Sequence, residues 1–293
     1  MKYWLLICFL LSNILNAFAA DSPILRSDHL TQFKILNVSD GLSDNHILDI
    51  VQDQQNVIWI ATINGLNRFN GQKIRSYQYN QSLINSLPSG IVSCLEVDND
   101  GKLWIGTQNG LCVYDSDIDG FQKIDLSYKN LDVSYIRAIH NEGDSIIWID
   151  VVSGYLLKYH KKKERVIESW EHHSLWQPYY YYHDIYRDKR NVLWIASRNI
   201  RPLYLDEETN SVQNLKYDVK SEFVQSDDAS CIFEDSHGHF WFAGLIGTYN
   251  LDLSKQSFTP LLDINTFTII ETKDRHVWFG TSKGIYIRSC IFI

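Results

Sequence analysis

Tryptophan recurs along this chain at nearly constant intervals, and this repeat constrains the fold more than any other feature. Six of the nine tryptophans stand 45, 44, 46, 47 and 37 residues apart, at Trp59, Trp104, Trp148, Trp194, Trp241 and Trp278. Most of these intervals lie in the range of about 40–47 residues, which indicates one supersecondary unit per repeat. The chain is therefore predicted to consist of a series of similar units.

The residues around each tryptophan recur as well. An aliphatic or aromatic residue precedes and follows it in every repeat, as in Leu103, Trp104 and Ile105. This pattern is typical of a strand that is buried on both faces. A glycine stands six residues after the tryptophan in every repeat except the fourth, which has Ile200. The turn after the strand is thus expected to use a positive φ, and each repeat predicts a hairpin.

Two further positions complete the unit. An aliphatic residue stands nine residues before each tryptophan, and an acidic residue stands six before it in all repeats but the last. The acidic side chain is expected to hold the turn between the first two strands by accepting hydrogen bonds from its own backbone. A more variable fourth strand follows the hairpin, for example Lys73 to Tyr77. Four antiparallel strands per repeat are typical of a propeller blade.

The sequence therefore predicts an all-β protein, a β-propeller of four-stranded antiparallel blades with six blades present and the ring incomplete. A β-helix or solenoid is the competing architecture, but its repeats are shorter, about 20–30 residues. The residues Phe33 to Leu36 resemble an outer strand, whereas Ser289 to Ile293 do not continue the repeat. We expect an open edge after the sixth unit.

The beginning of the chain differs from the rest. Met1 and Lys2 precede an apolar run that ends in a cluster of small residues, Ala17 to Ala20, which is typical of a secretory signal. The run is shorter than the roughly 20 residues that a bilayer crossing needs. We expect residues 1–20 to be a signal peptide and residues 21–293 to form the propeller segment, exported without a membrane span in the mature segment.

Charge and cysteine content narrow the possible functions. The net charge of −8, without a long basic run, argues against a nucleic-acid partner. Cys94 and Cys231 each stand ten residues before a tryptophan, so they occupy the same place in distant repeats and cannot meet. With Cys112 and Cys290 they show no regular spacing. All four are expected to be free thiols.

Common catalytic motifs are missing. The chain has no glycine-rich phosphate loop, no HExxH helix and no GxSxG elbow. His172, His173 and His183 do not have the spacing of metal ligands and are expected to be isolated, exposed residues. A glycosidase would need two carboxylates held across a pocket, which the sequence does not place. We therefore predict no metal, no cofactor and no catalytic residues.

An aromatic segment from Trp170 to His183 is the strongest local anomaly. Its tryptophans and tyrosines can stack on sugar rings, or they can fill a blade interface and an outer strand. The connections that enter each first strand are also expected to gather at the mouth of the central channel. The candidate ligand-binding residues are Asn45, His46, Tyr135, Arg137, Trp176, Tyr181, His183 and Asp228.

Three stretches carry a family resemblance: GLSDNHI with IWIATINGLNRFNG between Gly41 and Gly71, LWIGTQNGL from Leu103, and VWFGTSKGI from Val277. They resemble the two-component regulator propeller repeat, over roughly residues 33–288. The third repeat departs from the pattern, with Asp150 and Val151 where the others mostly have glycine or alanine and then threonine.

This resemblance implies a function. Such repeats form the periplasmic sensor region of hybrid two-component histidine kinases, which are inner-membrane proteins of Gram-negative bacteria, and many of these sensors respond to oligosaccharides. It implies an oligosaccharide ligand and a homodimer formed through the sensor region. No kinase sequence is present, so we predict a non-enzymatic N-terminal fragment of such a sensor. The alternatives are a propeller enzyme, either a polysaccharide lyase or a glycosidase, and a structural protein-interaction propeller.

Overall fold

The computed structural model describes residues 35–172, 183–197, 202–215, 231–245, 247–252, 254 and 257–289. The predicted signal peptide, residues 1–20, lies outside these ranges. The described residues form six antiparallel sheets, five with four strands and the last with three. In each sheet the strands are neighbours in the order in which they occur in the sequence. The predicted propeller blades are confirmed, and the sheets are called blades 1 to 6 below.

The strands of the blades have the following bounds. Blades 1 and 2 contain β1 (Ile47–Gln52), β2 (Ile58–Thr62), β3 (Gly65–Phe69), β4 (Ile74–Tyr77), β5 (Val92–Val97), β6 (Leu103–Thr107), β7 (Gly110–Asp115) and β8 (Gly120–Ile124). Blades 3 and 4 contain β9 (Ile136–Glu142), β10 (Ile146–Val151), β11 (Tyr155–His160), β12 (Arg165–Glu171), β13 (His183–Arg187), β14 (Leu193–Ser197), β15 (Leu203–Asp206) and β16 (Ser211–Asn214). Blades 5 and 6 contain β17 (Cys231–Glu234), β18 (Phe240–Gly244), β19 (Gly247–Asp252), β20 (Ser257–Leu262), β21 (Thr266–Glu271), β22 (His276–Thr281) and β23 (Gly284–Ser289).

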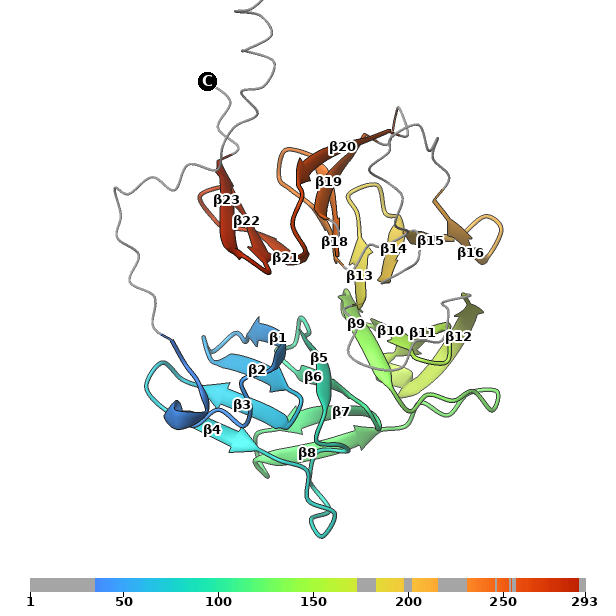
Figure 1. Ribbon diagram of the computed structural model, residues 1–293. Helices are drawn as coiled ribbons and strands as arrows, with labels where there is room; N and C mark the ends of the chain where they lie inside the picture. Colours follow the sequence, from blue (N-terminus) through green and yellow to red (C-terminus); the bar gives the residue numbers. More distant parts are fainter. Residues whose placement is uncertain are drawn as a thin grey trace, which may run out of the picture.

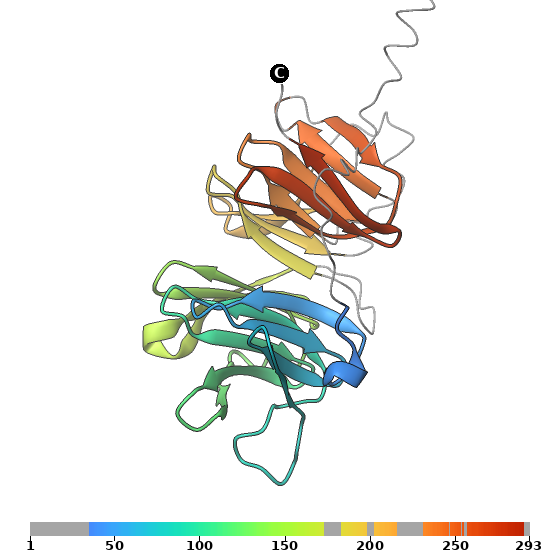
Figure 2. The ribbon, with the colours of Figure 1, turned by 90° about the vertical axis from the view of Figure 1, so that its left-hand side faces the viewer.

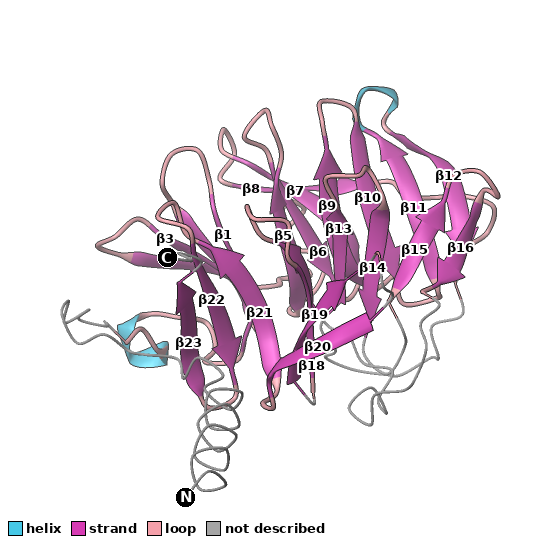
Figure 3. Ribbon diagram, turned by 90° about the horizontal axis from the view of Figure 1, so that it is seen from above, coloured by secondary structure: helices cyan, strands magenta, loops and turns pink. Residues whose placement is uncertain are grey.

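The blades are arranged around a common axis, with the first strand of each blade innermost (Figure 1). Viewed from the side, blades 1 to 3 occupy one half of the molecule and blades 4 to 6 the other (Figure 2). Strands account for nearly all the regular structure, and short 3-10 turns, η1 (Val38–Asp40) and η2 (Lys161–Lys163), lie at the periphery (Figure 3). In the part of the chain that is described, no helix has the length and apolar character needed to cross a membrane.

The acidic residue six positions before the tryptophan holds the turn between the first two strands, as predicted. In blade 2 the Asp98 Oδ1 atom accepts hydrogen bonds from the backbone N–H groups of Asp100 (3.0 Å) and Lys102 (2.9 Å). The sequence analysis missed the second half of the motif. The Trp104 indole N–H donates to Asp98 Oδ2 at 2.9 Å, so one carboxylate links the turn to the buried tryptophan. The same indole-to-carboxylate bond joins Trp59 to Asp53, Trp148 to Glu142, Trp194 to Asp188 and Trp241 to Asp235.

The glycine six residues after the tryptophan is needed for the hairpin turn. Gly65 has a φ of 125°, in the region that favours glycine, and a Cβ atom there would collide with the carbonyl group of Tyr77. The Thr62 hydroxyl donates to the Gly65 carbonyl at 2.9 Å and accepts from the Asn64 N–H at 3.1 Å. The predicted use of positive φ at this position is therefore confirmed.

One packing rule joins neighbouring blades. The tryptophan face of each blade packs against the residues that flank the tryptophan in the following blade. Between blades 1 and 2, for example, Trp59 lies in one buried cluster with Leu103 and Ile105. Four further clusters repeat this arrangement at the next four junctions. Burying apolar surface at these junctions is the main stabilising contribution to the ring.

The junction between blades 6 and 1 is different. None of the buried clusters of the described residues joins these two blades. Ile50 is 57% exposed, whereas Leu95 at the equivalent position in blade 2 is 4% exposed. On blade 6, Ile270 is 53% exposed and Trp278 is only partly buried. The described ring is thus open on this side (Figure 1), as the sequence predicted.

Two smaller predictions have different outcomes. Cys94, Cys112 and Cys231 are buried free thiols, as expected, and Cys290 lies outside the described residues. Of the predicted leading strand, Phe33 to Leu36, only Ile35 and Leu36 are described, and neither lies in a strand. Ile35 and Leu36 lie in irregular chain just before η1, and Ile35 is 80% exposed. The Asn37 cap that starts η1 commits this segment to a helical turn.

Candidate functional site

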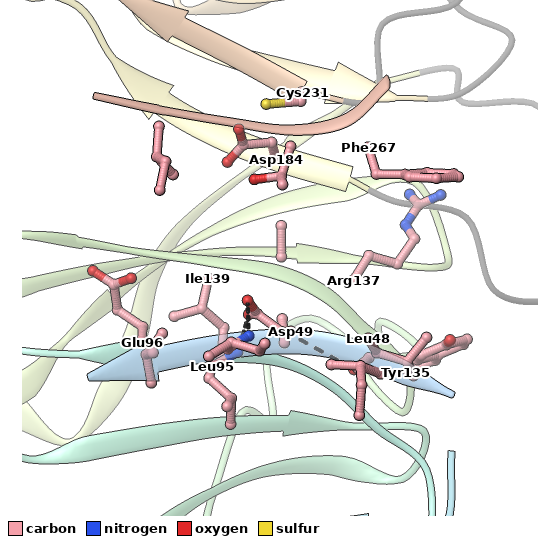
Figure 4. Close-up of a pocket in the computed structure, with 18 residues that line it drawn as sticks. Leu48, Asp49, Leu95, Glu96, Tyr135, Arg137, Ile139, Asp184, Cys231 and Phe267 are labelled. Carbon is pink, nitrogen blue, oxygen red and sulfur yellow. Dashed lines mark hydrogen bonds between the residues drawn. The ribbon is translucent and has the colours of Figure 1, made fainter. Parts of the chain in front are cut away.

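A cavity of about 710 Å³ lies between the innermost strands. The strands β1, β5, β9, β13, β17 and β21 all contribute to its wall (Figure 4). Small-molecule sites are usually cavities of about 300–1,000 Å³ with mostly apolar walls and a few placed polar groups. This cavity has that character, with Leu48, Ile139 and Phe267 among its apolar side chains and four charged side chains among its polar ones.

Three of these charged side chains are carboxylates from different blades: Asp49 on β1, Glu96 on β5 and Asp184 on β13. Asp49 Oδ2 accepts a hydrogen bond from the Leu95 N–H of the next blade at 2.7 Å. Asp184 Oδ2 accepts from the Ile232 N–H of its next blade at 3.3 Å. Both aspartates stand ten residues before their tryptophan, so they form the same link between blades at two places.

Glu96 makes a related link. Its Oε1 atom accepts a hydrogen bond from the Asn141 N–H of blade 3 at 3.0 Å. Burial is the largest of the effects that together raise the pKa of Glu96 to about 7; the Asn141 bond opposes the shift, and the charges of Asp49 and Asp184 add to it. Burial likewise raises the pKa of Asp49 to about 6 and that of Asp184 to about 6, although backbone hydrogen bonds oppose the shift. The cavity therefore holds three acids that ionise near neutral pH.

The fourth charged side chain, Arg137, is held by a buried ion pair. Its Nε atom lies 3.1 Å from Asp150 Oδ2, and its Nη2 group donates to the Val151 carbonyl at 2.8 Å. The His172 Nε2 atom lies 2.8 Å from Asp150 Oδ1. The side chains of Arg137, Asp150 and His172 are 8%, 0% and 1% exposed, so the whole group is removed from solvent.

The structure places the predicted ligand-binding residues unevenly. Tyr135 and Arg137 line the cavity, as the channel argument expected. Asn45 and His46 are exposed and are not among the described residues that line it, and Asn45 Oδ1 accepts from the Val38 N–H at 3.0 Å. His183 begins β13 opposite Ser197, and only its backbone is described. The other three, Trp176, Tyr181 and Asp228, lie outside the described residues.

The start of the aromatic segment belongs to the scaffold. Trp170 is 8% exposed, packs on Trp148 with ring centroids 5.5 Å apart, and donates its indole N–H to Asn210 Oδ1 at 2.8 Å. The prediction that His172 is an isolated, exposed histidine is wrong. It directly follows β12, which places its ring on the buried carboxylate of Asp150. No group of three potential metal ligands occurs within the described ranges.

The sequence analysis missed Asp49, Glu96 and Asp184. Asp49 and Asp184 occupy the same repeat position, directly before the aliphatic residue of the first strand. An acidic residue at a position that faces the axis was the signal available in the sequence. The sequence alone does not show which alternate side chains of the first strand face the axis.

Comparison with known proteins identifies the repeat. Residues 41–64 and 86–109 match the family model described as "Two component regulator propeller". The resemblance predicted from the sequence is confirmed in these two stretches. A 69-residue stretch, 24% of the chain, is 36% identical to "Histidine kinase P4" of Formosa agariphila and covers 5% of that protein.

Solved structures share the fold. The extracellular domain of a putative hybrid two component system of B. thetaiotaomicron matches 88% of this chain with a TM-score of 0.74 and 22% identity. The extracellular domain of a putative one component system of the same organism matches with a TM-score of 0.71 and 16% identity. The chain covers 35% and 37% of these two solved chains, so it spans about a third of their length.

Proposed function

We propose that this chain is the ligand-binding propeller of an exported two-component sensor, and that its ligand is an oligosaccharide. The observation that carries the proposal is the cavity bounded by the first strands of all six blades, with Tyr135 and Arg137 in its wall. The repeat type and the extracellular solved relatives support the sensor role. The signal peptide over residues 1–20 and a periplasmic location belong to the same proposal.

The lining of the cavity suits a sugar. Aromatic and aliphatic side chains, such as Phe267 and Ile139, offer apolar surface for the C–H faces of a sugar ring. The carboxylates of Asp49 and Asp184 offer acceptors for its hydroxyl groups. A cavity of about 710 Å³ is large enough for a small oligosaccharide. Trp176, Tyr181, His183 and Asp228 remain candidates for additional contacts at the mouth.

The sensor acts without chemistry in this proposal. Binding shifts the balance between two packing states of a homodimer, which requires that the ligand bind one state more tightly than the other. The kinase output resides in other parts of a sensor of this kind. The whole protein's signalling activity is thus part of the proposal.

A propeller glycosidase or lyase is the second candidate. Its support is the three carboxyl groups whose pKa values burial raises into the range of a general acid, to about 6, 7 and 6. Against it, each of these carboxylates accepts a backbone hydrogen bond from the next blade, which gives it a structural role. The non-catalytic role is therefore preferred.

Calorimetry of the chain against a panel of oligosaccharides tests the proposal. We expect saturable binding of at least one class and no new products when the mixture is analysed by chromatography after prolonged incubation. Shortened products would establish the enzyme instead. If no oligosaccharide binds, the ligand class is wrong. The mass of the secreted mature chain tests the signal peptide, because cleavage after residue 19 or 20 removes a defined segment.

A further inference from the structure

The third blade differs from the other repeats at two positions. Two residues after the tryptophan the other blades have a small residue, and blade 3 has Asp150; the small residues are Ala61, Gly106, Ala196, Ala243 and Gly280. Eleven residues before the tryptophan blade 3 has Arg137, where the other repeats carry no arginine or lysine; they have Leu48, Ser93, His183, Ser230 and Phe267. The two exceptional residues form an ion pair with each other.

The fold does not need this ion pair. Five other blades form the same strands with alanine or glycine at the Asp150 position. Removing two charges from water is costly, and a well-packed apolar pair often stabilises a protein as much or more. A buried pair that breaks a repeat rule is expected where function requires it. Asp150 is placed to hold Arg137 in a particular orientation.

That orientation places the guanidinium group at one end of the cavity. In Figure 4 the guanidinium of Arg137 lies beside the ring of Phe267, and Glu96 lies at the opposite side of the cavity. Tyr135 lies at the same end as Arg137 (Figure 4). This end of the cavity therefore presents a guanidinium group beside aromatic side chains, whereas the other charged side chains that line the cavity, Asp49, Glu96 and Asp184, are acidic.

We propose that the Arg137 end of the cavity binds the anionic group, a carboxylate or a sulfate ester, of an acidic oligosaccharide, and that Asp150 and His172 are positioning residues for Arg137. This inference rests on the proposed function and specifies its ligand class. A guanidinium group donates charge-assisted hydrogen bonds to the oxygens of carboxylates and sulfates, and bonds of this kind are the stronger ones. The ring of Phe267 packs on the sugar that carries the charge.

The carboxylates give the ligand a direction. An anionic group near Asp49 or Asp184 would be repelled, whereas sugar hydroxyls there donate hydrogen bonds to the carboxylate oxygens. An acidic sugar therefore enters with its charge toward Arg137 and its hydroxyl groups toward the aspartates. A neutral sugar of the same size loses the contact with Arg137 and leaves the guanidinium without the ligand's charge.

The test compares three trisaccharides: tri-galacturonate, a sulfated galactotriose and unmodified galactotriose. Calorimetry with the full chain is expected to show at least about tenfold tighter binding of one or both acidic trisaccharides than of the neutral one, the effect of a charge-assisted bond. The two acidic probes distinguish the carboxylate from the sulfate. Arg137→Met should remove this preference, so that the acidic and neutral trisaccharides bind with similar affinity.

Matched variants separate recognition from folding. Arg187 is similarly buried, at 13% side-chain exposure, and pairs with Glu142 at 2.8 Å, but it is not among the described residues that line the cavity. Arg187→Met should keep the preference for the acidic ligand. Asp150→Asn keeps the arginine charge but loosens its orientation, so it should weaken acidic binding about tenfold more than neutral binding, whereas general damage would weaken both equally. If Arg137→Met fails to fold, Arg137→Lys serves instead and should reduce the preference.

The outcomes are distinguishable. Equal affinities for acidic and neutral trisaccharides, or acidic binding that survives Arg137→Met, would overturn this inference and leave an oligosaccharide sensor standing. Binding of no saccharide in the panel by the unmodified chain would overturn the proposed function and this inference with it. Loss of acidic binding in both Arg137→Met and Arg187→Met would indicate a general loss of stability and would also count against an anion-binding role for Arg137.

Discussion

Replacing Asp98 by asparagine should destabilise the propeller far more than its small change in size suggests. The two oxygens of Asp98 serve four donors: the backbone N–H groups of Asp100 and Lys102 on Oδ1, and Trp104 Nε1 and Lys161 Nζ on Oδ2. Burial raises the pKa of this carboxyl, but the bonds from Trp104 and Lys102 and the charge of Lys161 outweigh it and hold the pKa below its usual value. The folded protein thus selects the charged form.

The size of this destabilisation depends on which hydrogen bonds of Asp98 an asparagine can still make. Its one carbonyl oxygen can still accept from the turn, but its amide group then faces the indole N–H of Trp104 and the ammonium group of Lys161, which are both donors. Lys161 and Asp98 have side-chain exposures of 8% and 2%, so water cannot compensate. Removing one partner of a buried pair costs about 3–5 kcal/mol. We expect a loss of that size in the free energy of unfolding.

Denaturant unfolding, followed by circular dichroism, measures this loss. Asp100→Asn is the matched control, since Asp100 is exposed two residues away, and it should change the free energy of unfolding by less than about 0.5 kcal/mol. A double-mutant cycle with Trp104→Phe isolates the indole bond and should show a coupling of about 1–2 kcal/mol. If Asp98→Asn unfolds like the unmodified chain, or if the coupling is zero, the linking role of this carboxylate is refuted.

Three other predictions can be checked with the same unfolding assay. Leu95→Ala should cost about 2–5 kcal/mol, whereas Ile50→Ala at the equivalent repeat position should cost less than about 1 kcal/mol, because only Leu95 is buried; similar costs would indicate that blades 6 and 1 are packed together. The pKa of Asp49 is about 6 in the folded protein and lower in the unfolded chain, so Asp49 contributes fully to stability below about pH 4 and loses this contribution as the pH rises through 6. Between pH 4 and pH 7.5, the free energy of unfolding of Asp49→Asn should therefore rise by about 1–3 kcal/mol relative to that of the unmodified chain. Parallel pH profiles of the two proteins would contradict this. Gly65→Ala should destabilise at least about 1 kcal/mol more than Gly110→Ala, because a Cβ meets a carbonyl group only at Gly65, and equal losses would mean that this close approach does not exist in solution.

The blade architecture could be predicted because it depends on short-range patterns that repeat. The tryptophan with its aliphatic neighbours determines a buried strand, and the glycine six residues later determines the hairpin, as at Trp104 and Gly110. The acidic turn residue could also be predicted, because Asp98 bonds to its own neighbours in sequence. Its bond to the tryptophan was harder to foresee, since it requires the two strands to be already paired.

Contacts between blades could not be read from the sequence in the same way. Asp49 bonds to Leu95, which is 46 residues away, and the pairing depends on how two complete blades meet. The burial of His172 also depends on the folded sheet, because its partner Asp150 lies on β10 of the same blade, two strands away from β12. Residue type alone favoured an exposed histidine, and tertiary packing overrode that preference.

A repeat protein provides its own reference for separating structural from functional residues. Where five blades carry the same kind of residue and the same contact, as at the tryptophan and its carboxylate, packing explains the residue. Ile50 is aliphatic like its equivalents in the other blades, but it is exposed while they are buried. Its exposure therefore marks the open junction. Arg137 and Asp150 are the reverse case: their blade packs like the other blades, but their residue types differ from those at the equivalent positions. The packing that all blades share therefore does not explain these two residue types, and we infer that their function lies in the cavity that Arg137 lines.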